Sequence, residues 1–181
     1  TDIDTVMVIG CGMIGAGAIV RASLRGATVI AVDLSDDKLE LAKQIGAAYT
    51  INSKDLNFRQ QLEEITDGHG PDVIIEAVGS STTYLMAIEE VSFTGRVVYI
   101  GYAKDEVSFQ TKLFVQKELN ILGSRNALPE DFRSVIRYMQ KGVFPKEKFI
   151  TRICSPKEAL NAMQEWANEP GKVFRILVEF N

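Results

Sequence analysis

The sequence predicts an α/β fold in which six parallel strands form one sheet with helices on both faces. Short apolar runs rich in β-branched residues recur along most of the chain and alternate with stretches of helical periodicity. These runs are continuously apolar, which is typical of strands that are covered on both faces. The chain has 181 residues, which is enough for one such domain and a further segment.

Six runs predict the strands, in the order Thr5–Ile9, Thr28–Val32, Tyr49–Ile51, Asp72–Ala77, Arg96–Ile100 and Asn120–Gly123. Stretches with helical spacing follow them, at Ala16–Arg25, Asp36–Ile45, Phe58–Ile65, Ser80–Val91, Lys112–Lys117 and Asp131–Lys141. Gly46 is a typical helix stop, and Thr66–Pro71 is a turn. Strands and helices in this order predict a doubly wound parallel sheet of strand order 3-2-1-4-5-6, the Rossmann fold.

The chain from Phe144 onward has a different character. It predicts, in order, a strand at Phe149–Cys154, a helix at Lys157–Asn168, a turn at Pro170-Gly171 and a strand at Phe174–Glu179. Pro156 is typical of the start of that helix. Because this segment follows six complete strands, we expect two parts, residues 1–143 and residues 144–181.

Composition and charge exclude several function classes. With 46% hydrophobic and 24% charged residues and a net charge of −4, the chain has no basic stripe for nucleic acid. No apolar run reaches the ~18 residues of a membrane span. No signal peptide is visible, and the start at Thr1 indicates a cut. The two cysteines, Cys11 and Cys154, predict no disulfide framework, so we expect a cytoplasmic protein.

The run Gly10–Gly15, of sequence GCGMIG, is the most informative motif. It follows the first predicted strand and opens the first predicted helix. The second strand ends in Asp33, which comes 18 residues after Gly15. Strand, G-x-G-x-x-G, helix, strand and acid in this order and spacing form the fingerprint of a dinucleotide-binding site.

Each residue type in the run has a physical reason. Gly10 permits the tight turn out of the strand, Gly12 lets a pyrophosphate approach the backbone, and Gly15 allows close packing of helix and sheet. The N–H groups near Met13 and Ile14 face the phosphates, and the helix dipole favours negative charge there. The run therefore predicts a pyrophosphate site.

Asp33 predicts NAD rather than NADP. Its carboxylate can accept hydrogen bonds from the ribose hydroxyls, whereas a carboxylate about 4 Å from one unit of phosphate charge costs roughly 4 kcal/mol at an effective dielectric near 20. The following residues, Leu34–Asp37, add further acids. The alternative is a related domain that binds another adenine nucleoside, or no nucleotide.

Taken together, these pieces resemble the medium-chain dehydrogenase/reductase family, the zinc-type alcohol dehydrogenases. The resemblance extends over nearly the whole chain and is carried by Val8–Gly15, Asp33 through Gly46-Ala47, Gly68–Gly79, Gly95–Gly101 and Glu118–Ser124. Within the family the chain is most similar to the polyol, threonine and sugar-acid dehydrogenases. Gly123–Asn126, of sequence GSRN, is similar to sugar-acid dehydrogenases of the galactonate type.

The resemblance implies a cofactor-binding set made of Gly10, Gly12, Met13, Ile14, Gly15, Asp33, Lys38, Val78, Gly79, Ile100, Gly101 and Leu122. Val78 and Gly79 would line the nicotinamide ribose. Ile100 and Leu122 would offer backbone groups to the carboxamide. Lys38 would lie beside the adenosine ribose, although it can equally be a solvated helix residue that pairs with nearby acids.

No zinc ligand and no catalytic residue is expected in this chain. The resemblance implies that zinc ligands belong to a catalytic domain that precedes the cofactor domain. Here the single histidine, His69, lies in a turn, and the two cysteines are 143 positions apart, so no ligand spacing exists. Glu76, at the end of a strand, is interpreted as a loop-anchoring or helix-terminus carboxylate before a catalytic base.

The resulting expectation is the NAD-binding part of a dehydrogenase, inactive alone, whose zinc polarises a secondary alcohol of a polyol, sugar acid or similar compound while hydride passes to NAD. The alternative is a free-standing Rossmann module that senses NAD(H). A zinc-free reductase and a methyltransferase are less well supported. The tail discriminates the first two, because a fragment would leave apolar residues without their partner domain: Phe149, Ile153, Ile176 and Val178. An exposed edge strand at Asn120–Leu122 predicts a homodimer.

Overall fold

A computed structural model describes residues 2–142, 144–169 and 173–180 of the chain. The chain divides into two compact units, Thr1–Arg125 and Asn126–Asn181. The turn predicted at Pro170-Gly171 lies outside the described residues. The predicted boundary between residues 143 and 144, where the chain would leave the cofactor domain and return to the catalytic domain, stays a prediction.

The first unit contains the predicted sheet. Its strands are β1 (Thr5–Ile9), β2 (Thr28–Asp33), β3 (Tyr49–Asn52), β4 (Val73–Glu76), β5 (Arg96–Tyr99) and β6 (Asn120–Gly123). They form one six-stranded sheet of order β3-β2-β1-β4-β5-β6, and every neighbouring pair is parallel. The predicted fold class and strand order are confirmed.

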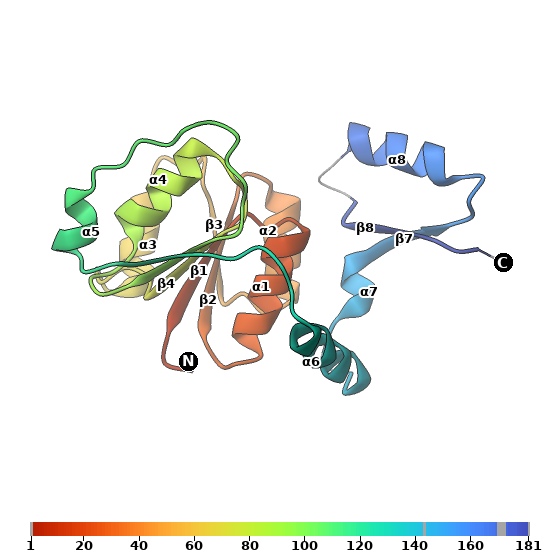
Figure 1. Cartoon of the computed structure of the whole chain (residues 1–181), viewed down its shortest axis with the longest axis horizontal. Helices are drawn as coiled ribbons and strands as arrows, with labels where there is room; N and C mark the ends of the chain where they lie inside the picture. Colours follow the sequence, from red (N-terminus) through yellow and green to blue (C-terminus); the bar gives the residue numbers. More distant parts are fainter. Residues whose placement is uncertain (1, 143, 170–172, 181) are drawn as a thin grey trace. The chain divides into compact units, whose positions relative to one another are not determined.

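Helices cover both faces of this sheet (Figure 1). They are α1 (Met13–Ser23), α2 (Asp36–Gln44), α3 (Phe58–Thr66), α4 (Ser81–Glu90) and α5 (Lys112–Gln116). Helices α1 and α2 lie on one side of the sheet, and α3, α4 and α5 lie on the other. This arrangement explains why the strands are apolar along their whole length, since both faces of each inner strand are covered.

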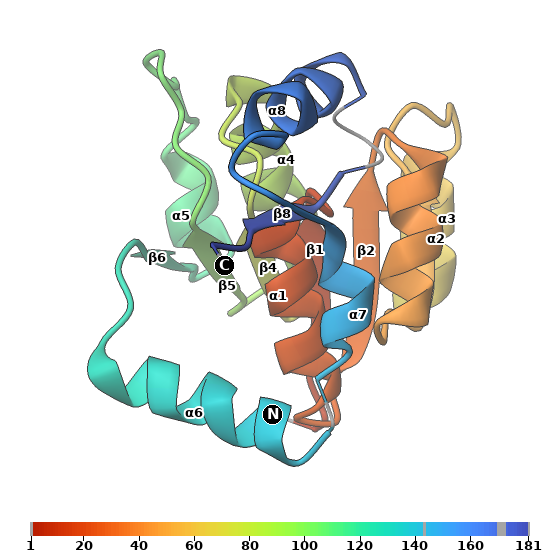
Figure 2. The ribbon, with the colours of Figure 1, turned by 90° about the vertical axis from the view of Figure 1, so that its right-hand side faces the viewer.

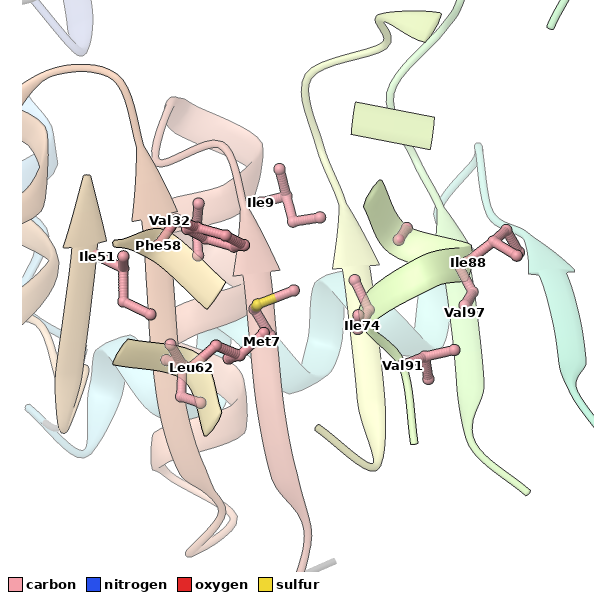
Figure 3. Close-up of a cluster of buried hydrophobic side chains, with 12 residues drawn as sticks. Met7, Ile9, Val32, Ile51, Phe58, Leu62, Ile74, Ile88, Val91 and Val97 are labelled. Atoms are coloured by element: carbon pink, nitrogen blue, oxygen red, sulfur yellow. The ribbon is translucent and has the colours of Figure 1, made fainter. Parts of the chain in front are cut away.

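A buried cluster packs the sheet against α3 and α4 (Figure 3). Met7, Ile74 and Val97 supply it from three adjacent strands, while Leu62 and Ile88 supply it from the two helices. These side chains are all nearly or fully buried. Burying a side chain of this size stabilises the fold by about 1.5–3 kcal/mol, so the cluster holds β1, β4 and β5 firmly in place.

Two local differences from the sequence-based expectation have physical reasons. Helix α1 begins at Met13, three residues earlier than expected, because the backbone turns at Gly10 (φ +92°) and Gly12 is already the N-cap. A short helix, α7 (Lys146–Phe149), precedes the strand predicted to begin at Phe149. Its single turn is too short to show a helical period in the sequence.

The second unit contains three helices, α6, α7 and α8, and a small two-stranded sheet among its described residues, all labelled in Figure 2 except one strand of the sheet, which Figure 1 labels. Its elements after α7 are β7 (Ile150–Cys154), α8 (Ala159–Asn168) and β8 (Arg175–Val178), and α6 (Pro129–Gln140) precedes them. Strands β7 and β8 pair in parallel, as a strand–helix–strand unit requires.

The exposure of apolar residues in this unit is mixed. Phe149 was expected to be left exposed without its partner domain, but it is buried within this unit and stacks on Phe144 with ring centroids 4.9 Å apart. Ile153 and Val178 are exposed, at 61% and 38%, as expected, and Ile176 is half-buried. The described residues contain no helix that is long and apolar enough to cross a membrane.

Candidate functional site

The register of the sheet brings the ends of five strands into one row. Ile9 pairs with Val32 on one side and with Glu76 on the other. Glu76 pairs in turn with Tyr99, and Tyr99 with Gly123. The residues that follow these five therefore emerge at the same edge. Because β1 and β4 are neighbours and their helices lie on opposite faces, this edge contains the switch point where doubly wound folds bind ligands.

The glycine run forms a tight turn at this edge. Gly10 has φ +92°, and a Cβ there would lie 2.6 Å from the Cγ2 atom of Val78. A Cβ on Gly15 would overlap the carbonyl oxygen of Gly10, so α1 starts directly against the turn that precedes it. The lack of a side chain at Gly15 is therefore needed mainly for the close approach of α1 to the Gly10 turn. Toward the sheet, a Cβ on Gly15 would make only an ordinary contact with the Val8 side chain, at 3.4 Å.

The space beside Gly12 is open. No heavy atom lies within 4 Å of the position that a Cβ on Gly12 would occupy. The N-terminus of α1 has no side-chain cap, and the N–H groups of Met13 and Ile14 have no acceptor within the helix. Open space beside unpaired N–H groups at a helix N-terminus suits a phosphate, so the geometry fits a dinucleotide pyrophosphate.

Asp33 has a second role that the sequence did not reveal. Its Oδ2 accepts a hydrogen bond from the Cys11 N–H at 2.7 Å, and its Oδ1 accepts from the N–H groups of Leu34 and Ser35 at 2.8 and 3.0 Å. These three bonds orient the carboxylate and tie the end of β2 to the glycine turn. Oδ1 uses both of its lone pairs in these bonds, whereas Oδ2 keeps a further lone pair that a ribose hydroxyl can use.

Cys11 is a buried thiol within the turn. It is 1% exposed, and its thiol donates to the carbonyl of Val32 at 3.7 Å. Burial, with the nearby Asp33 carboxylate, raises the pKa of Cys11 to about 12. The thiol is therefore protonated at neutral pH, and the interpretation of Cys11 as a small buried side chain agrees with this environment.

Lys38 lies in the first turns of α2 and is half-buried. Its positive charge acts to lower the pKa of the Cys11 thiol, against the larger effect of burial. The ammonium group is therefore close enough to the glycine turn to act there electrostatically. Both interpretations, a role beside the ribose and a solvated helix residue, stay open.

The turn after β4 carries the other half of the predicted site. Val78 is 52% exposed at the strand-end row. Gly79 has φ +83°, and a Cβ there would lie 2.5 Å from the backbone nitrogen and 2.7 Å from the carbonyl oxygen of Tyr102. The turns after β4 and β5 are therefore in direct backbone contact.

The side chain of Glu76 holds this turn by hydrogen bonds to its backbone. Its side chain is fully buried, and Oε1 accepts hydrogen bonds from the N–H groups of Val78 and Gly79 at 2.9 and 2.8 Å and from the Thr83 hydroxyl at 2.8 Å. The interpretation of Glu76 as a loop-anchoring carboxylate is confirmed. Its other oxygen, Oε2, is buried without a hydrogen-bond partner among the described residues.

The end of β5 is tied to the same residue. The N–H groups of Ile100 and Gly101 both donate to the main-chain carbonyl of Glu76, at 2.9 and 3.0 Å. Leu122 pairs with Val98, so it lies two residues deeper along the strands than Ile100. Ser124, which donates its N–H to Tyr99 at 2.9 Å, lies level with Ile100 instead.

Three residues of this region escaped the sequence analysis. Thr83 and Tyr84 lie in the first turn of α4, and the Tyr84 hydroxyl donates to the carbonyl of Gly101 at 2.7 Å. Tyr102 is 75% exposed, with the guanidinium of Arg125 over its ring at 5.6 Å. Nothing in their spacing distinguishes them from ordinary helix or loop residues, because their role depends on contacts across the sheet.

His69 lies at the opposite edge. It precedes β4 and lines a surface pocket of about 510 Å³ together with Asp72 and Lys117. Over residues 2–142, 144–169 and 173–180, no three His, Cys, Asp or Glu side chains are grouped closely enough to hold a metal ion.

Comparisons with known proteins agree with this geometry. The family model for zinc-binding dehydrogenases matches residues 14–141. Sorbitol dehydrogenase of Halalkalibacterium halodurans is 32% identical over 76% of this chain and 41% of its own length. Erythritol/L-threitol dehydrogenase of Mycolicibacterium smegmatis is 33% identical over 82% of this chain and 41% of its own length.

Solved structures give the same picture. A protein described as a short chain alcohol dehydrogenase (rspB) from Escherichia coli CFT073, complexed with NADH, matches 99% of this chain and 53% of its own with a TM-score of 0.91 and 27% identity. The 2R,3R-butanediol dehydrogenase from Bacillus subtilis matches 98% of this chain and 51% of its own, with a TM-score of 0.89 and 26% identity. The chain therefore spans about half the length of these proteins, or less.

Proposed function

The chain belongs to the family of zinc-binding dehydrogenases, and on that premise we propose that it is the NAD-binding part of an alcohol dehydrogenase. The single observation that carries the proposal is the arrangement around Gly12: open space, unpaired N–H groups at the start of α1, and the oriented Asp33 carboxylate at the end of β2. The presence of NADH in the related E. coli structure supports this choice of cofactor.

In this proposal NAD lies across the strand-end row. Met13 and Ile14 hold the pyrophosphate, while Asp33 and Lys38 hold the adenosine ribose. The nicotinamide half lies over the turns after β4 and β5, where Val78, Gly79, Ile100 and Gly101 were predicted to contribute, with Leu122 of β6 as the remaining predicted contact. NAD supplies the hydride acceptor, and this chain binds and orients it.

The substrate class is a secondary alcohol in a polyol, sugar acid or similar compound. Relatives named as sorbitol, erythritol/L-threitol and L-galactonate-5-dehydrogenases support this assignment. Zinc ligands would come from residues outside this sequence, and so would most substrate contacts. We therefore propose that the chain alone does not oxidise such alcohols.

The apolar surface of the second unit supports a part of a larger enzyme over a free-standing NAD(H) sensor. Helix α6 exposes a row of apolar side chains, and α8 exposes another: Phe132, Val135, Ile136 and Met139 on the first, Leu160, Met163 and Trp166 on the second. A sensor lobe with its own core would cover these residues, whereas a catalytic domain in the complete enzyme would pack on them.

We further propose a cytoplasmic homodimer. Both cysteines are unpaired thiols, in keeping with a reducing compartment. Strand β6 is the edge of the sheet, and Ile121 and Leu122 are 39% and 49% exposed on it. An apolar edge strand pairs readily with a second copy. Sedimentation of the wild-type chain and of Ile121→Lys tests this, and an equal monomer mass for both would contradict it.

Calorimetric titration with NAD and NADP tests the cofactor. The wild-type chain should bind NAD more tightly, and Asp33→Ala should remove most of that preference, because the ribose hydroxyls lose their acceptor and a 2′-phosphate loses a repulsive charge. Asp37→Ala, an acid nearby in α2 that makes no hydrogen bond to the turn in the described structure, is the matched control. Equal binding of both cofactors by the wild-type chain would contradict the NAD assignment.

A further inference from the structure

The buried carboxyl group of Glu76 is the least explained feature of this region. It is 0% exposed, and Oε2 has no hydrogen-bond partner among the described residues. Leaving a buried polar atom unpaired destabilises the folded state. Oε1 alone makes the side-chain hydrogen bonds of the loop anchor, so the buried, unpaired Oε2 requires a further reason.

The contacts of Glu76 join two turns that are far apart in sequence. Oε1 accepts from two successive N–H groups of the turn after β4, those of Val78 and Gly79. The main-chain carbonyl of the same residue accepts from both N–H groups that leave β5, those of Ile100 and Gly101. A single residue thus holds the backbone where the chain leaves both neighbouring strands, β4 and β5.

Oε2 lies against the second of these turns. A Cβ on Gly101 would lie 2.5 Å from Oε2, so the carboxyl group fills the space directly beneath the Gly101 backbone. Helix α4 completes the arrangement, because the Thr83 hydroxyl donates to Oε1 and the Tyr84 hydroxyl donates to the Gly101 carbonyl. The carboxylate therefore orients both turns, and hydrogen bonds to an ionised acceptor are about twice as strong as neutral ones.

We propose that Glu76 is a positioning residue for the nicotinamide half of the cofactor, acting through the paired turns Val78-Gly79 and Ile100-Gly101, and that it has no part in binding the adenosine half. This inference rests on the proposed NAD site and deepens it. The adenosine half depends on Asp33 and the glycine turn, and none of the Glu76 side-chain contacts reaches those residues in the described structure.

Two ligands separate the halves experimentally. ADP contains the adenosine and pyrophosphate groups, and NADH contains these and the nicotinamide nucleoside. For Glu76→Gln we expect the affinity for NADH to fall about tenfold, because the charge that strengthens three hydrogen bonds is lost. The affinity for ADP should stay within about twofold, because none of the Glu76 side-chain hydrogen bonds reaches the glycine turn or Asp33 in the described structure. Glu89→Gln, which removes an exposed carboxylate from α4, is the matched control and should change neither affinity.

Thr83 supplies a second test should Glu76→Gln fold poorly. Thr83→Val removes one donor to Oε1 and should lower NADH affinity about fivefold without changing ADP affinity. Thr83→Ser restores the hydroxyl and should recover wild-type binding of NADH. This rescue would not follow from a general loss of stability.

The outcomes are distinct. An equal loss of NADH and ADP affinity in Glu76→Gln would reduce Glu76 to a structural residue and overturn the proposal, as would unchanged affinity for both ligands. A wild-type chain that binds ADP but not NADH would overturn it as well, while leaving the adenosine half of the proposed function intact. A wild-type chain that binds neither ligand would overturn the proposed function itself.

Discussion

The two ends of the candidate cofactor site are built in different ways. At the adenosine end, the turn from Gly10 to Gly15 and the carboxylate of Asp33 lie within one strand–helix–strand unit, and Asp33 accepts a hydrogen bond from the Cys11 N–H. At the nicotinamide end, β4, α4 and β5 form a second strand–helix–strand unit, in which Glu76 joins the turns after both strands and accepts a hydrogen bond from Thr83 of α4. The first end is visible as a sequence motif because its glycines and its acid recur at a known spacing, whereas the second depends on hydrogen bonds of Glu76 and Thr83 that follow no such motif.

The comparison also explains the different uses of glycine. At the adenosine end Gly12 leaves open space, and among the described residues no atom outside the glycine and its chain neighbours lies within 4 Å of its missing Cβ. At the nicotinamide end Gly79 leaves space for another part of the chain, the backbone at Tyr102. A glycine of the first kind serves binding directly, and one of the second kind serves the assembly of the site. The predictions below test this difference.

The largest effect is expected at Gly15. Gly15→Val should destabilise the chain by about 3 kcal/mol and abolish NAD binding, since the new side chain overlaps the Gly10 carbonyl and forces the turn apart. Gly17→Ala in the same helix meets no atom within 4 Å and should stabilise by up to about 1 kcal/mol. Urea denaturation of both variants measures this, and equal stability of the two would refute the close contact.

Gly79→Ala should cost about 2–3 kcal/mol, because positive φ disfavours any side chain and the Cβ also meets the Tyr102 backbone. Gly68→Ala is the control for φ alone, since Gly68 has φ +76° with no atom within 4 Å and should cost about 1 kcal/mol. The difference between the two variants in thermal or urea unfolding measures the turn–turn contact. Equal destabilisation by Gly79→Ala and Gly68→Ala would show that the turns after β4 and β5 can move apart at little cost in stability.

The Cys11 thiol makes stability at the adenosine end depend on pH. Its pKa is about 12 in the folded chain against an ordinary 9.0, so between these values the unfolded state binds fewer protons and stability falls as pH rises. The loss attributable to this group is about 1.4 kcal/mol per pH unit across that window, with none below it. Cys11→Ala should show a correspondingly shallower decline from pH 9 to 11 in urea denaturation, and parallel curves would contradict the assignment.

The smallest effect is expected for Tyr84→Phe. It removes the hydrogen bond to the Gly101 carbonyl while keeping the ring stacked on Tyr99, and it should cost about 1 kcal/mol. Tyr49→Phe, at a half-exposed position of the opposite edge strand, should cost less than about 0.5 kcal/mol. Equal losses of stability in the two variants would show that the hydrogen bond from α4 does not stabilise the turn after β5.

The sequence by itself determined the fold class, the strand order and the adenosine end. Strand and helix periods are local properties, and the glycine run with Asp33 acts within one βαβ unit, so its spacing survives in the linear chain. Loop anchoring by Glu76 was also foreseen from its place at a strand end. Even there the bond from the Cys11 N–H to Asp33 was not visible, because it spans the turn and the next strand.

Only the tertiary structure decided the nicotinamide end and the state of the second unit. The register of β5 and β6 places Ser124 opposite Ile100. Thr83 and Tyr102 contribute only through their contacts with Glu76 and Gly79, which belong to other segments of the chain. Phe149 was expected to be left exposed, but it stacks on Phe144, which precedes the strand and meets it only through the turn of α7. Contacts between segments distant in sequence leave no periodic trace, so they become evident only when strands are paired and helices are docked.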